Sequence, residues 1–206
     1  MRRPVMLGVA VGVLGLWACA DRNVDPEDLP PRLGDGGSLL PDGGGVDVLR
    51  VFVTSQTYDG DLVTRAGGGV DGLTAADTLC RQVGAALSTR RFKAYLSTAG
   101  SNPVDRIEGA GPWVLAGPQP TVAFPDRSAL ASGPTVIPLL TETGGTPAGL
   151  VWTGVSSSDC LGWTSPSVAA GMAMLGDPSL SGSGWLSAQT ADCSTFHALY
   201  CFEAPP

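Results

Sequence analysis

The chain has 206 residues, which is enough for one domain with a buried core and too short for two ordinary ones. Its formal charge of −7 argues against nucleic acid as a partner. The single histidine, His197, excludes zinc sites built on several histidines and leaves one residue that could act as the base of a catalytic triad. No cofactor is expected. Five cysteines are an odd number, so one of them is expected to have a separate role.

The N-terminal segment predicts a secretory signal peptide over residues 1–18. Arg2 and Arg3 give it a positive start, and an uncharged, mostly apolar stretch follows as far as Ala18. An uncleaved membrane anchor is the alternative, although 17 uncharged residues lie at the lower limit of a membrane span. Ordinary cleavage without lipidation is the other alternative.

The sequence Leu-Trp-Ala-Cys at positions 16–19 distinguishes between these alternatives. It resembles the bacterial lipobox, which implies cleavage before Cys19 and lipidation of this cysteine as the mature N-terminus. Two or more acyl chains hold a protein stably on a membrane. The resemblance therefore implies a lipoprotein of the bacterial cell envelope, anchored at the outer membrane and facing the periplasm or the exterior.

Residues 19–47 are predicted to be the lipidated cysteine and a flexible tether. The 28 residues after Cys19 contain six Gly, four Pro and seven acidic residues, and they show no apolar periodicity. Such a segment cannot bury enough surface to offset its chain entropy. As a flexible coil it spans about 30 Å, so it would hold a domain at 48–206 away from the lipid surface.

The best-defined element of this domain is a helix predicted over residues 74–87. Thr74 can cap its start, and Asp77 occupies the third position after the cap, where a carboxylate is favourable. Cys80 shares the apolar face of this helix and is expected to point into the core. The residues with the spacing of that face are Ala76, Leu79, Cys80, Val83 and Leu87.

The remaining elements are short. Runs of apolar and β-branched residues predict strands over 49–54, 92–96, 112–115, 121–124, 136–140, 150–155 and 197–202. A helical turn is expected over 126–131, and the glycine-rich residues 64–72 are expected to be a loop. One main helix, many short strands and long loops predict an α+β domain with a modest antiparallel sheet.

The motif Asp-Gly-Asp at 59–61 indicates a turn. A calcium loop is the alternative, but further oxygen ligands at the required spacing are missing. Four cysteines remain in the domain, and a secreted protein is expected to join them in two disulfides. Zinc is the alternative, but no Cys-x-x-Cys pair occurs, and the sequence leaves three disulfide pairings open. These cysteines are Cys80, Cys160, Cys193 and Cys201.

The order of several segments carries a family resemblance. A helix with a buried cysteine comes early, a Val-Trp-Thr-Gly strand lies in the middle, and a pair of cysteines closes the chain. The segments are 51–54, 73–80, 92–97, 105–106, 151–154 and 199–202. Together they resemble the C-type lectin-like fold and, more narrowly, the bacterial endostatin-like lipoproteins, over most of residues 49–203.

The resemblance implies nested disulfides, in which Cys80 pairs with Cys201 and Cys160 pairs with Cys193. In lectin-like folds the long loops after the central strands carry the ligand surface. A ligand would therefore be expected at residues 156–192, which are rich in Ser, Gly and Ala.

Candidate catalytic and metal-binding residues are few. The calcium-binding motifs Glu-Pro-Asn, Gln-Pro-Asp and Trp-Asn-Asp of sugar-binding lectins are missing, so we expect calcium-independent binding and no metal. No Gly-x-Ser-x-Gly motif occurs, and His197 alternates with apolar residues on a predicted strand, so we expect no catalytic residue. Asp105 and Arg106 are interpreted as an ion pair that fixes a loop. A carboxylate pair with Glu108 or Glu142 is the catalytic alternative.

The four tryptophans of the mature chain are expected in the core. Trp185 follows Gly-Ser-Gly, so it is the first candidate for an exposed, ligand-binding ring, and Trp163 is the second. The predicted function is a monomeric, non-catalytic domain that binds an extracellular protein or glycan. An envelope hydrolase and a purely structural surface module are the alternatives.

Overall fold

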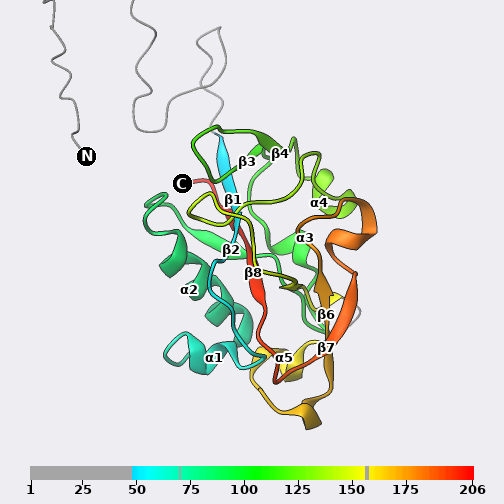
Figure 1. Cartoon of the computed structure of the whole chain (residues 1–206). Coiled ribbons are helices and arrows are strands. Elements are labelled where there is room, and N and C mark those ends of the chain that lie inside the picture. The colour runs from blue at the N-terminus through cyan, green and yellow to red at the C-terminus, as the bar shows by residue number, and fades with distance from the viewer. Residues whose placement is uncertain (1–47, 70, 156–157) are drawn as a thin grey trace, which may run out of the picture. The chain divides into compact units, whose positions relative to one another are not determined.

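A computed structural model describes residues 48–206 except residues 70, 156 and 157, so the predicted signal peptide, Cys19 and the tether lie outside the described residues. The described part mixes helices and strands, which confirms the α+β class (Figure 1). The strands are β1 (Leu49–Val53), β2 (Phe92–Ala94), β3 (Trp113–Leu115), β4 (Val122–Phe124), β5 (Val151–Trp152), β6 (Met172–Gly176), β7 (Gln189–Asp192) and β8 (Ala198–Glu203). The helical elements are α1 (Leu62–Arg65), α2 (Gly72–Gly84), α3 (Pro103–Arg106), α4 (Ala129–Ser132), α5 (Cys160–Trp163), η3 (Val168–Ala170) and η4 (Gly182–Trp185).

Strand β8 is the centre of the sheet, because it pairs with β1, β2 and β5 and all six of its residues are buried. The strand order is β4-β3-β1-β8-β5-β6-β7, with β2 also on β8. The pairs β1–β3 and β5–β8 are parallel, so the sheet is mixed and the expectation of an antiparallel sheet is wrong for these pairs. Two parallel strands must be joined by a crossover connection, and the connection from β1 to β3 contains α1 and α2.

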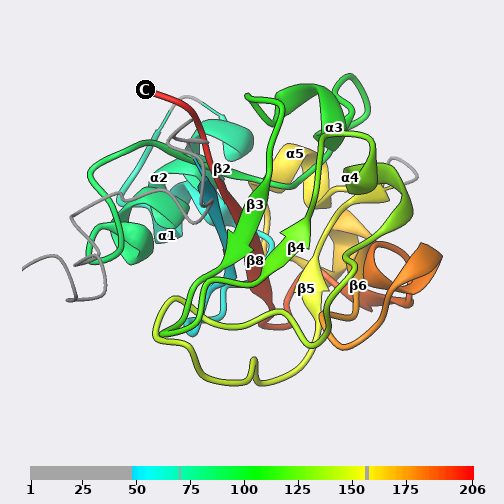
Figure 2. The same ribbon diagram turned by 90° about the horizontal axis from the view of Figure 1, so that it is seen from above.

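Both faces of this sheet are buried, and alternate residues of one strand enter different cores. In β1, Phe52 packs under the helices on one face, while Val51 and Val53 pack on the other. Helices α1, α2 and α5 contribute to the first core, and α4 and η4 to the second. Figure 2 shows α1 and α2 on one side of the strands and α4 on the other.

Helix α2 begins two residues before its predicted start. Asp71, not Thr74, is the N-cap: its Oδ1 accepts the backbone N–H of Thr74 at 2.9 Å. Hydrogen bonds from the Thr74 backbone and hydroxyl lower the pKa of Asp71. The first helical residue is Gly72. Only glycine fits at this position, because a Cβ there would lie 2.1 Å from the carbonyl oxygen of Gly162. Cys80 faces the core, as the periodicity predicts.

Some predicted elements are wrong. Residues 136–140 are not a strand, because Pro138 has no N–H to donate and the neighbouring N–H of Leu139 bonds to Pro178 at 2.9 Å. The predicted loop at 64–72 begins inside α1. Strands β6 and β7 have no counterpart in the prediction, because neither carries a run of β-branched residues.

Element α5 is a left-handed turn, since its four residues all have positive φ angles between 50° and 69°. L-residues adopt this conformation rarely and at a cost of about 1–2 kcal/mol each. The turn is held by a disulfide at Cys160, by the buried ring of Trp163 and by Asp159, whose Oδ1 accepts the N–H of Gly162 at 3.0 Å. Leu161 lies between these anchors, and 67% of its surface is exposed.

We expect Leu161→Gly to stabilise the domain by about 1 kcal/mol. The substitution removes the cost of a positive φ and loses little burial, although glycine offsets part of the gain through the entropy of the unfolded chain. Urea denaturation measures the change. Leu180→Gly is the matched control, because Leu180 is also exposed but has no positive φ, and this variant should be less stable than the wild type. An equal loss in both variants would contradict the strained turn.

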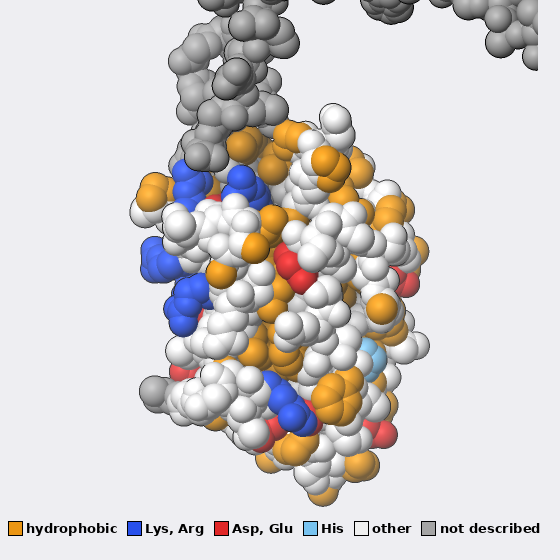
Figure 3. All heavy atoms as spheres, turned by 60° about the vertical axis from the view of Figure 1, so that its left-hand side comes forward, with side chains coloured by type: hydrophobic (Ala, Val, Ile, Leu, Met, Phe, Trp, Pro, Cys, Tyr) orange, Lys and Arg blue, Asp and Glu red, His pale blue; other side chains and the backbone are white. Residues whose placement is uncertain are grey.

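Charged side chains are unevenly distributed over the domain. All eight Lys and Arg residues of 48–206 lie between Arg50 and Arg127, and none occurs in 128–206. Figure 3 shows Lys and Arg side chains gathered toward the upper left of one face, with a single one among acidic and apolar side chains near the lower end. The basic residues of the domain are therefore confined to the first part of its sequence.

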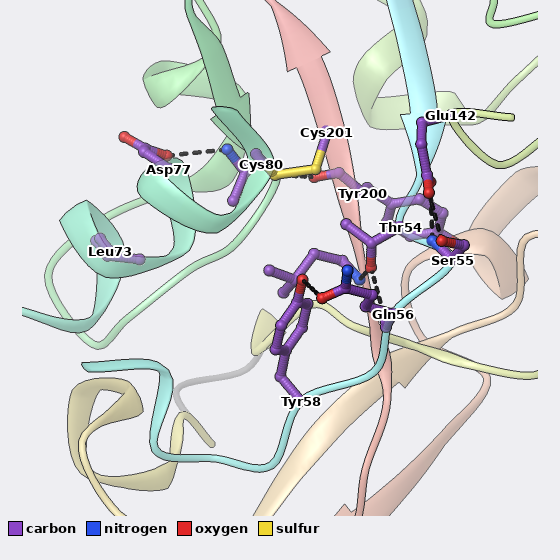
Figure 4. The surroundings of a disulfide bond; sticks show 12 residues. Thr54, Ser55, Gln56, Tyr58, Leu73, Asp77, Cys80, Glu142, Tyr200 and Cys201 are labelled. Carbon is purple, nitrogen blue, oxygen red and sulfur yellow. Dashed lines mark hydrogen bonds between the residues drawn. A yellow bond between two sulfur atoms is a disulfide. The ribbon is translucent and has the colours of Figure 1, made fainter. Parts of the chain in front are cut away.

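The structure contains two disulfides, Cys80–Cys201 and Cys160–Cys193. This is the nested pairing that the resemblance implies. The first joins the middle of α2 to the central strand β8 (Figure 4). The second joins the left-handed turn to the short segment between β7 and β8.

Candidate binding site

A pocket of about 620 Å³ opens beside the loop that joins β2 to α3. Most of its wall is the segment from Ser97 to Val104, and it is completed by Ala131 at α4, Val155 after β5 and Leu186 after η4. Tyr95 also lines it. All of these residues are uncharged, so the pocket suits a ligand without strong charge.

Residues distant in the sequence hold this loop in place. The indole N–H of Trp163 donates to the carbonyl of Ser97 at 2.7 Å, and the backbone N–H of Ser97 donates to Thr153 at 3.0 Å. The N–H of Ala99 donates to Oδ2 of Asp159 at 3.1 Å. The left-handed turn and its flanking aspartate thus position the pocket wall.

The loop presents polar groups that are free to bind. Within the described residues, the hydroxyls of Thr98 and Ser101 and the side-chain N–H groups of Asn102 have no hydrogen-bond partner. The backbones of Thr98 and Ser101 bond to each other at 3.1 and 3.3 Å and keep the turn closed. Oδ1 of Asn102 accepts the N–H of Val104 at 3.0 Å, which leaves its amide nitrogen to donate.

Tyr95 is a fixed part of this wall. Its hydroxyl donates to the carbonyl of Leu130 at 2.9 Å, and its ring lies 4.8 Å from the ring of Trp185. Burial raises the pKa of Tyr95, so the phenol stays protonated at neutral pH. It therefore contributes an apolar face to the pocket and no acid or base.

The expectation that the four tryptophans lie in the core is confirmed, so the two candidates for an exposed ligand-binding ring, Trp185 and Trp163, are not exposed. Both rings are fully buried, as are Trp113 and Trp152. Trp163 bonds to the pocket wall from behind, and Trp185 packs behind Tyr95. The physical reason is that a ring of this size lowers the free energy most inside the core, where these side chains fill space under the loops. They support the pocket and do not line it.

The segment expected to carry the ligand surface contributes little to the pocket. Of the described residues in 156–192, only Leu186 lines it. The main wall, Ser97 to Val104, escaped prediction because its small polar residues carry no catalytic or metal-binding group. Its sequence signal is a run of turn-forming residues followed by Pro103, between a strand and a helix.

His197 lies outside the pocket lining. It forms an isolated β-bridge with Tyr58, its ring lies 4.6 Å from the ring of Trp152, and its Nε2 is 3.0 Å from the hydroxyl of Thr195. Burial lowers the pKa of His197, while a hydrogen bond with the backbone of Leu150 opposes this shift. The imidazole is accordingly neutral at pH 7 and packs against the ring of Trp152 in β5.

The interpretation of Asp105 and Arg106 as an ion pair is wrong. Asp105 is exposed on α3, and Arg106 instead donates to Oδ1 of Asp77 at 2.9 Å and to the carbonyl of Ala94 at 2.7 Å. Asp77 also accepts from Nζ of Lys93 at 3.0 Å. These contacts join α2, β2 and α3, so Asp77 connects three elements and does not serve as a cap.

The other carboxylates have structural partners. Glu142 accepts hydrogen bonds from the backbone and hydroxyl of Ser55, and Glu108 pairs with Arg91 at 3.1 Å. Within the Asp-Gly-Asp motif, Asp59 pairs with Arg65, and Asp61 caps α1. Within the described residues, no group of three or more His, Cys, Asp or Glu side chains could hold a metal ion.

Comparisons with known proteins give no family assignment: no protein-family model matches the sequence, and no curated protein matches it. Among the residues that the structure describes, no helix has both the length and the apolar character needed to cross a membrane.

Proposed function

We propose that this chain is a lipid-anchored protein of the bacterial cell envelope whose domain binds a protein or glycan ligand without catalysis and without calcium. The observation that carries the proposal is the neutral pocket beside the β2–α3 loop. It combines an apolar wall with unpartnered hydroxyl and amide groups, which is the chemistry that sugar hydroxyls or a peptide backbone require.

The surroundings of the pocket support a binding role over a catalytic one. Among the described residues that line it there is no carboxylate, histidine, lysine or cysteine, and Tyr95 donates its hydroxyl to a backbone carbonyl. General acid–base catalysis needs a titratable group within hydrogen-bond reach of the substrate. An uncharged wall can still select a ligand by shape and by hydrogen bonds.

The domain arrangement also supports membership of the C-type lectin-like and endostatin-like group. Helix α2 packs against the sheet, its Cys80 is bonded to the last strand, and a second disulfide joins the left-handed turn to the segment before β8. A lipidated Cys19 and a tether would hold this domain outside the membrane. Its proposed partners are therefore the membrane, through the lipid anchor, and an extracellular molecule, through the pocket.

Filling the pocket should abolish ligand binding without unfolding the domain. Ala99 and Ala131 are exposed lining residues on two different segments, so Ala99→Trp and Ala131→Trp each place an indole in the opening. The measurement is binding of the purified protein to a glycan and matrix-protein array, with and without chelator. We expect wild-type binding that survives the chelator and falls at least tenfold in both variants.

Ala86→Trp is the control for this test, because Ala86 is exposed beyond the end of α2 and does not line the pocket. It should bind like the wild type. Loss of binding in the control or retention in both pocket variants would contradict the assignment. A protein that binds nothing on the array favours the structural module, and turnover of an array ligand favours the hydrolase.

The proposed anchor makes a separate prediction. Cys19→Ala should move the protein from the membrane fraction to the soluble fraction, because no acyl chain can then be attached. Metabolic labelling with a fatty acid should mark the wild type and leave the variant unlabelled. Ala20→Ser is the control and should stay in the membrane fraction. A variant that still sediments with membranes, beside an unlabelled wild type, would exclude lipidation.

A further inference from the structure

A second, smaller cleft of about 250 Å³ lies between the loop before β5 (yellow-green in Figure 2) and the turn after β6. A hydrogen bond from the N–H of Leu139 to the carbonyl of Pro178, at 2.9 Å, joins these two segments. No described residue lines both this cleft and the pocket beside the β2–α3 loop, so the cleft is a separate site. Its apolar wall is made by three prolines and one leucine, which are Pro138, Pro147, Pro178 and Leu150.

Among the described residues that line the cleft, one is charged. It is Asp177, and its side chain is partly buried. Oδ1 of Asp177 accepts two hydrogen bonds from Ser179, one from the backbone N–H at 2.8 Å and one from the hydroxyl at 2.5 Å. Within the described residues, no donor contacts Oδ2, and no cation pairs with this carboxylate. Asp177 therefore keeps one carboxylate oxygen for a ligand.

The rest of the lining suits a ligand that donates hydrogen bonds. Proline has no backbone N–H, so the three prolines of the wall add no backbone donor. The side chains of Thr146 and Ser179 also line the cleft, and their hydroxyl oxygens can accept hydrogen bonds. An ammonium group has a positive charge, three N–H donors and no acceptor, which matches this lining.

The single free oxygen of Asp177 favours the ammonium of lysine over the guanidinium of arginine. Arginine binds a carboxylate best through two parallel hydrogen bonds, which need both oxygens. Here Oδ1 already accepts two hydrogen bonds from Ser179. A lysine ammonium is a compact charge that needs one oxygen, and its aliphatic stem can lie along an apolar wall.

Large apolar side chains next to the cleft are exposed in both segments. Ile137, beside Pro138, is 47% exposed, and Leu180, beside Ser179, is 44% exposed. Exposed apolar side chains that surround a polar site are typical of a protein–protein contact. A free amine in the cleft would leave both side chains in water, whereas a polypeptide that presents a lysine could cover them.

We propose that this cleft binds a lysine side chain of a partner protein. The ammonium donates to Oδ2 of Asp177, the stem lies against the proline wall, and the residues beside the lysine cover Ile137 and Leu180. This second site depends neither on the pocket beside the β2–α3 loop nor on lipidation of Cys19, so it goes beyond the proposed function.

The test titrates the isotope-labelled, purified protein with acetylated tripeptide amides and follows its backbone N–H signals by NMR. Leu-Lys-Leu should shift the signals of Leu150 and Ser179. Norleucine in place of the lysine keeps the stem but lacks the ammonium, and it should weaken binding about tenfold, the effect of one charge-assisted hydrogen bond. Gly-Lys-Gly should bind about fivefold more weakly, which corresponds to roughly 40 Å² of apolar surface left in water. Leu-Arg-Leu should also bind more weakly than Leu-Lys-Leu.

Asp177→Asn should weaken binding of Leu-Lys-Leu about tenfold and leave binding of the norleucine peptide unchanged. Asparagine keeps Oδ1 as the acceptor for Ser179, so the turn is retained. Asp126→Asn is the matched control. Oδ1 of Asp126 accepts the same two hydrogen bonds from Ser128, at 2.8 and 2.5 Å, but Asp126 does not line the cleft. This control should bind Leu-Lys-Leu like the wild type.

Several outcomes would overturn the proposal. Equal binding of the lysine and norleucine peptides would show that the cleft does not select a cation. An equal loss in Asp177→Asn and Asp126→Asn would show that binding follows the total charge of the protein and not the cleft. Tighter binding of Leu-Arg-Leu would exclude the preference for lysine, and binding of none of the peptides would exclude the site.

Discussion

Replacing Cys80 and Cys201 together by alanine should unfold the domain at room temperature. The disulfide closes a segment of 121 residues, and the chain-entropy model assigns about 5 kcal/mol to a loop of that length. Both cysteines are fully buried between α2 and β8, as Figure 4 shows for the bond and its neighbours, so the substitution also leaves a cavity. Small domains have about 5–15 kcal/mol of stability in total.

The second disulfide provides the comparison. Cys160–Cys193 closes 33 residues, for which the same model gives about 3.7 kcal/mol. Its removal also frees the left-handed turn to relax, which offsets part of the loss. Circular dichroism and urea titration should show a folded Cys160→Ala/Cys193→Ala variant and an unfolded Cys80→Ala/Cys201→Ala variant. Two folded variants of similar stability would show that β8 does not depend on its bond to α2.

The main elements of this fold can be predicted from hydropathic periodicity, because the pattern of apolar residues within each of these segments matches the face that it buries. The face that contains Cys80 repeats with helical spacing, and β8 is a compact apolar run, so both could be predicted from neighbours alone. The ends of α2 could not. Gly72 and Gly84 lie at its two ends, where the helix packs so closely against Trp163 and Phe92 that a Cβ would not fit.

The elements that escaped prediction depend on distant partners. Strand β7 is polar and exposed, and it is a strand only because it pairs along β6 at the sheet edge. The segment 136–140 shows the opposite case, in which an apolar run is kept out of the ladder by Pro138. Local propensity misses such elements because tertiary pairing decides their structure.

The candidate site was hidden for a related reason. Its wall is a run of Ser, Thr, Ala, Gly and Asn residues, whose shape depends on Asp159 and Trp163 about 60 residues further along the chain. The Gly-Ser-Gly segment before Trp185 indicates an exposed ring, but the large rings of Trp185 and Trp163 are buried behind the wall. The sequence therefore points to two residues that support the pocket, Trp163 and Trp185, but the residues that line it become clear only from the fold.

Gly176→Ala should destabilise the domain by about 3 kcal/mol or more, although it adds a single methyl group. A Cβ at this position would lie 1.8 Å from the carbonyl oxygen of Trp185 and 3.1 Å from a methyl group of Thr153. The carbonyl cannot move freely, because it accepts the hydroxyl of Tyr200 at 2.9 Å. Overpacking against fixed backbone is among the costly single substitutions.

The same substitution should also weaken ligand binding in the fraction that remains folded. Trp185 precedes Leu186, which lines the pocket, and its ring supports Tyr95 from behind. Gly69→Ala is the control, because a Cβ there meets no atom within 4 Å, and its stability should stay within about 1 kcal/mol of the wild type. Urea denaturation followed by tryptophan fluorescence measures both variants. If Gly176→Ala were as stable as Gly69→Ala, the backbone of η4 could not lie against β6, and the wall that Leu186 and Tyr95 form would have to be placed differently.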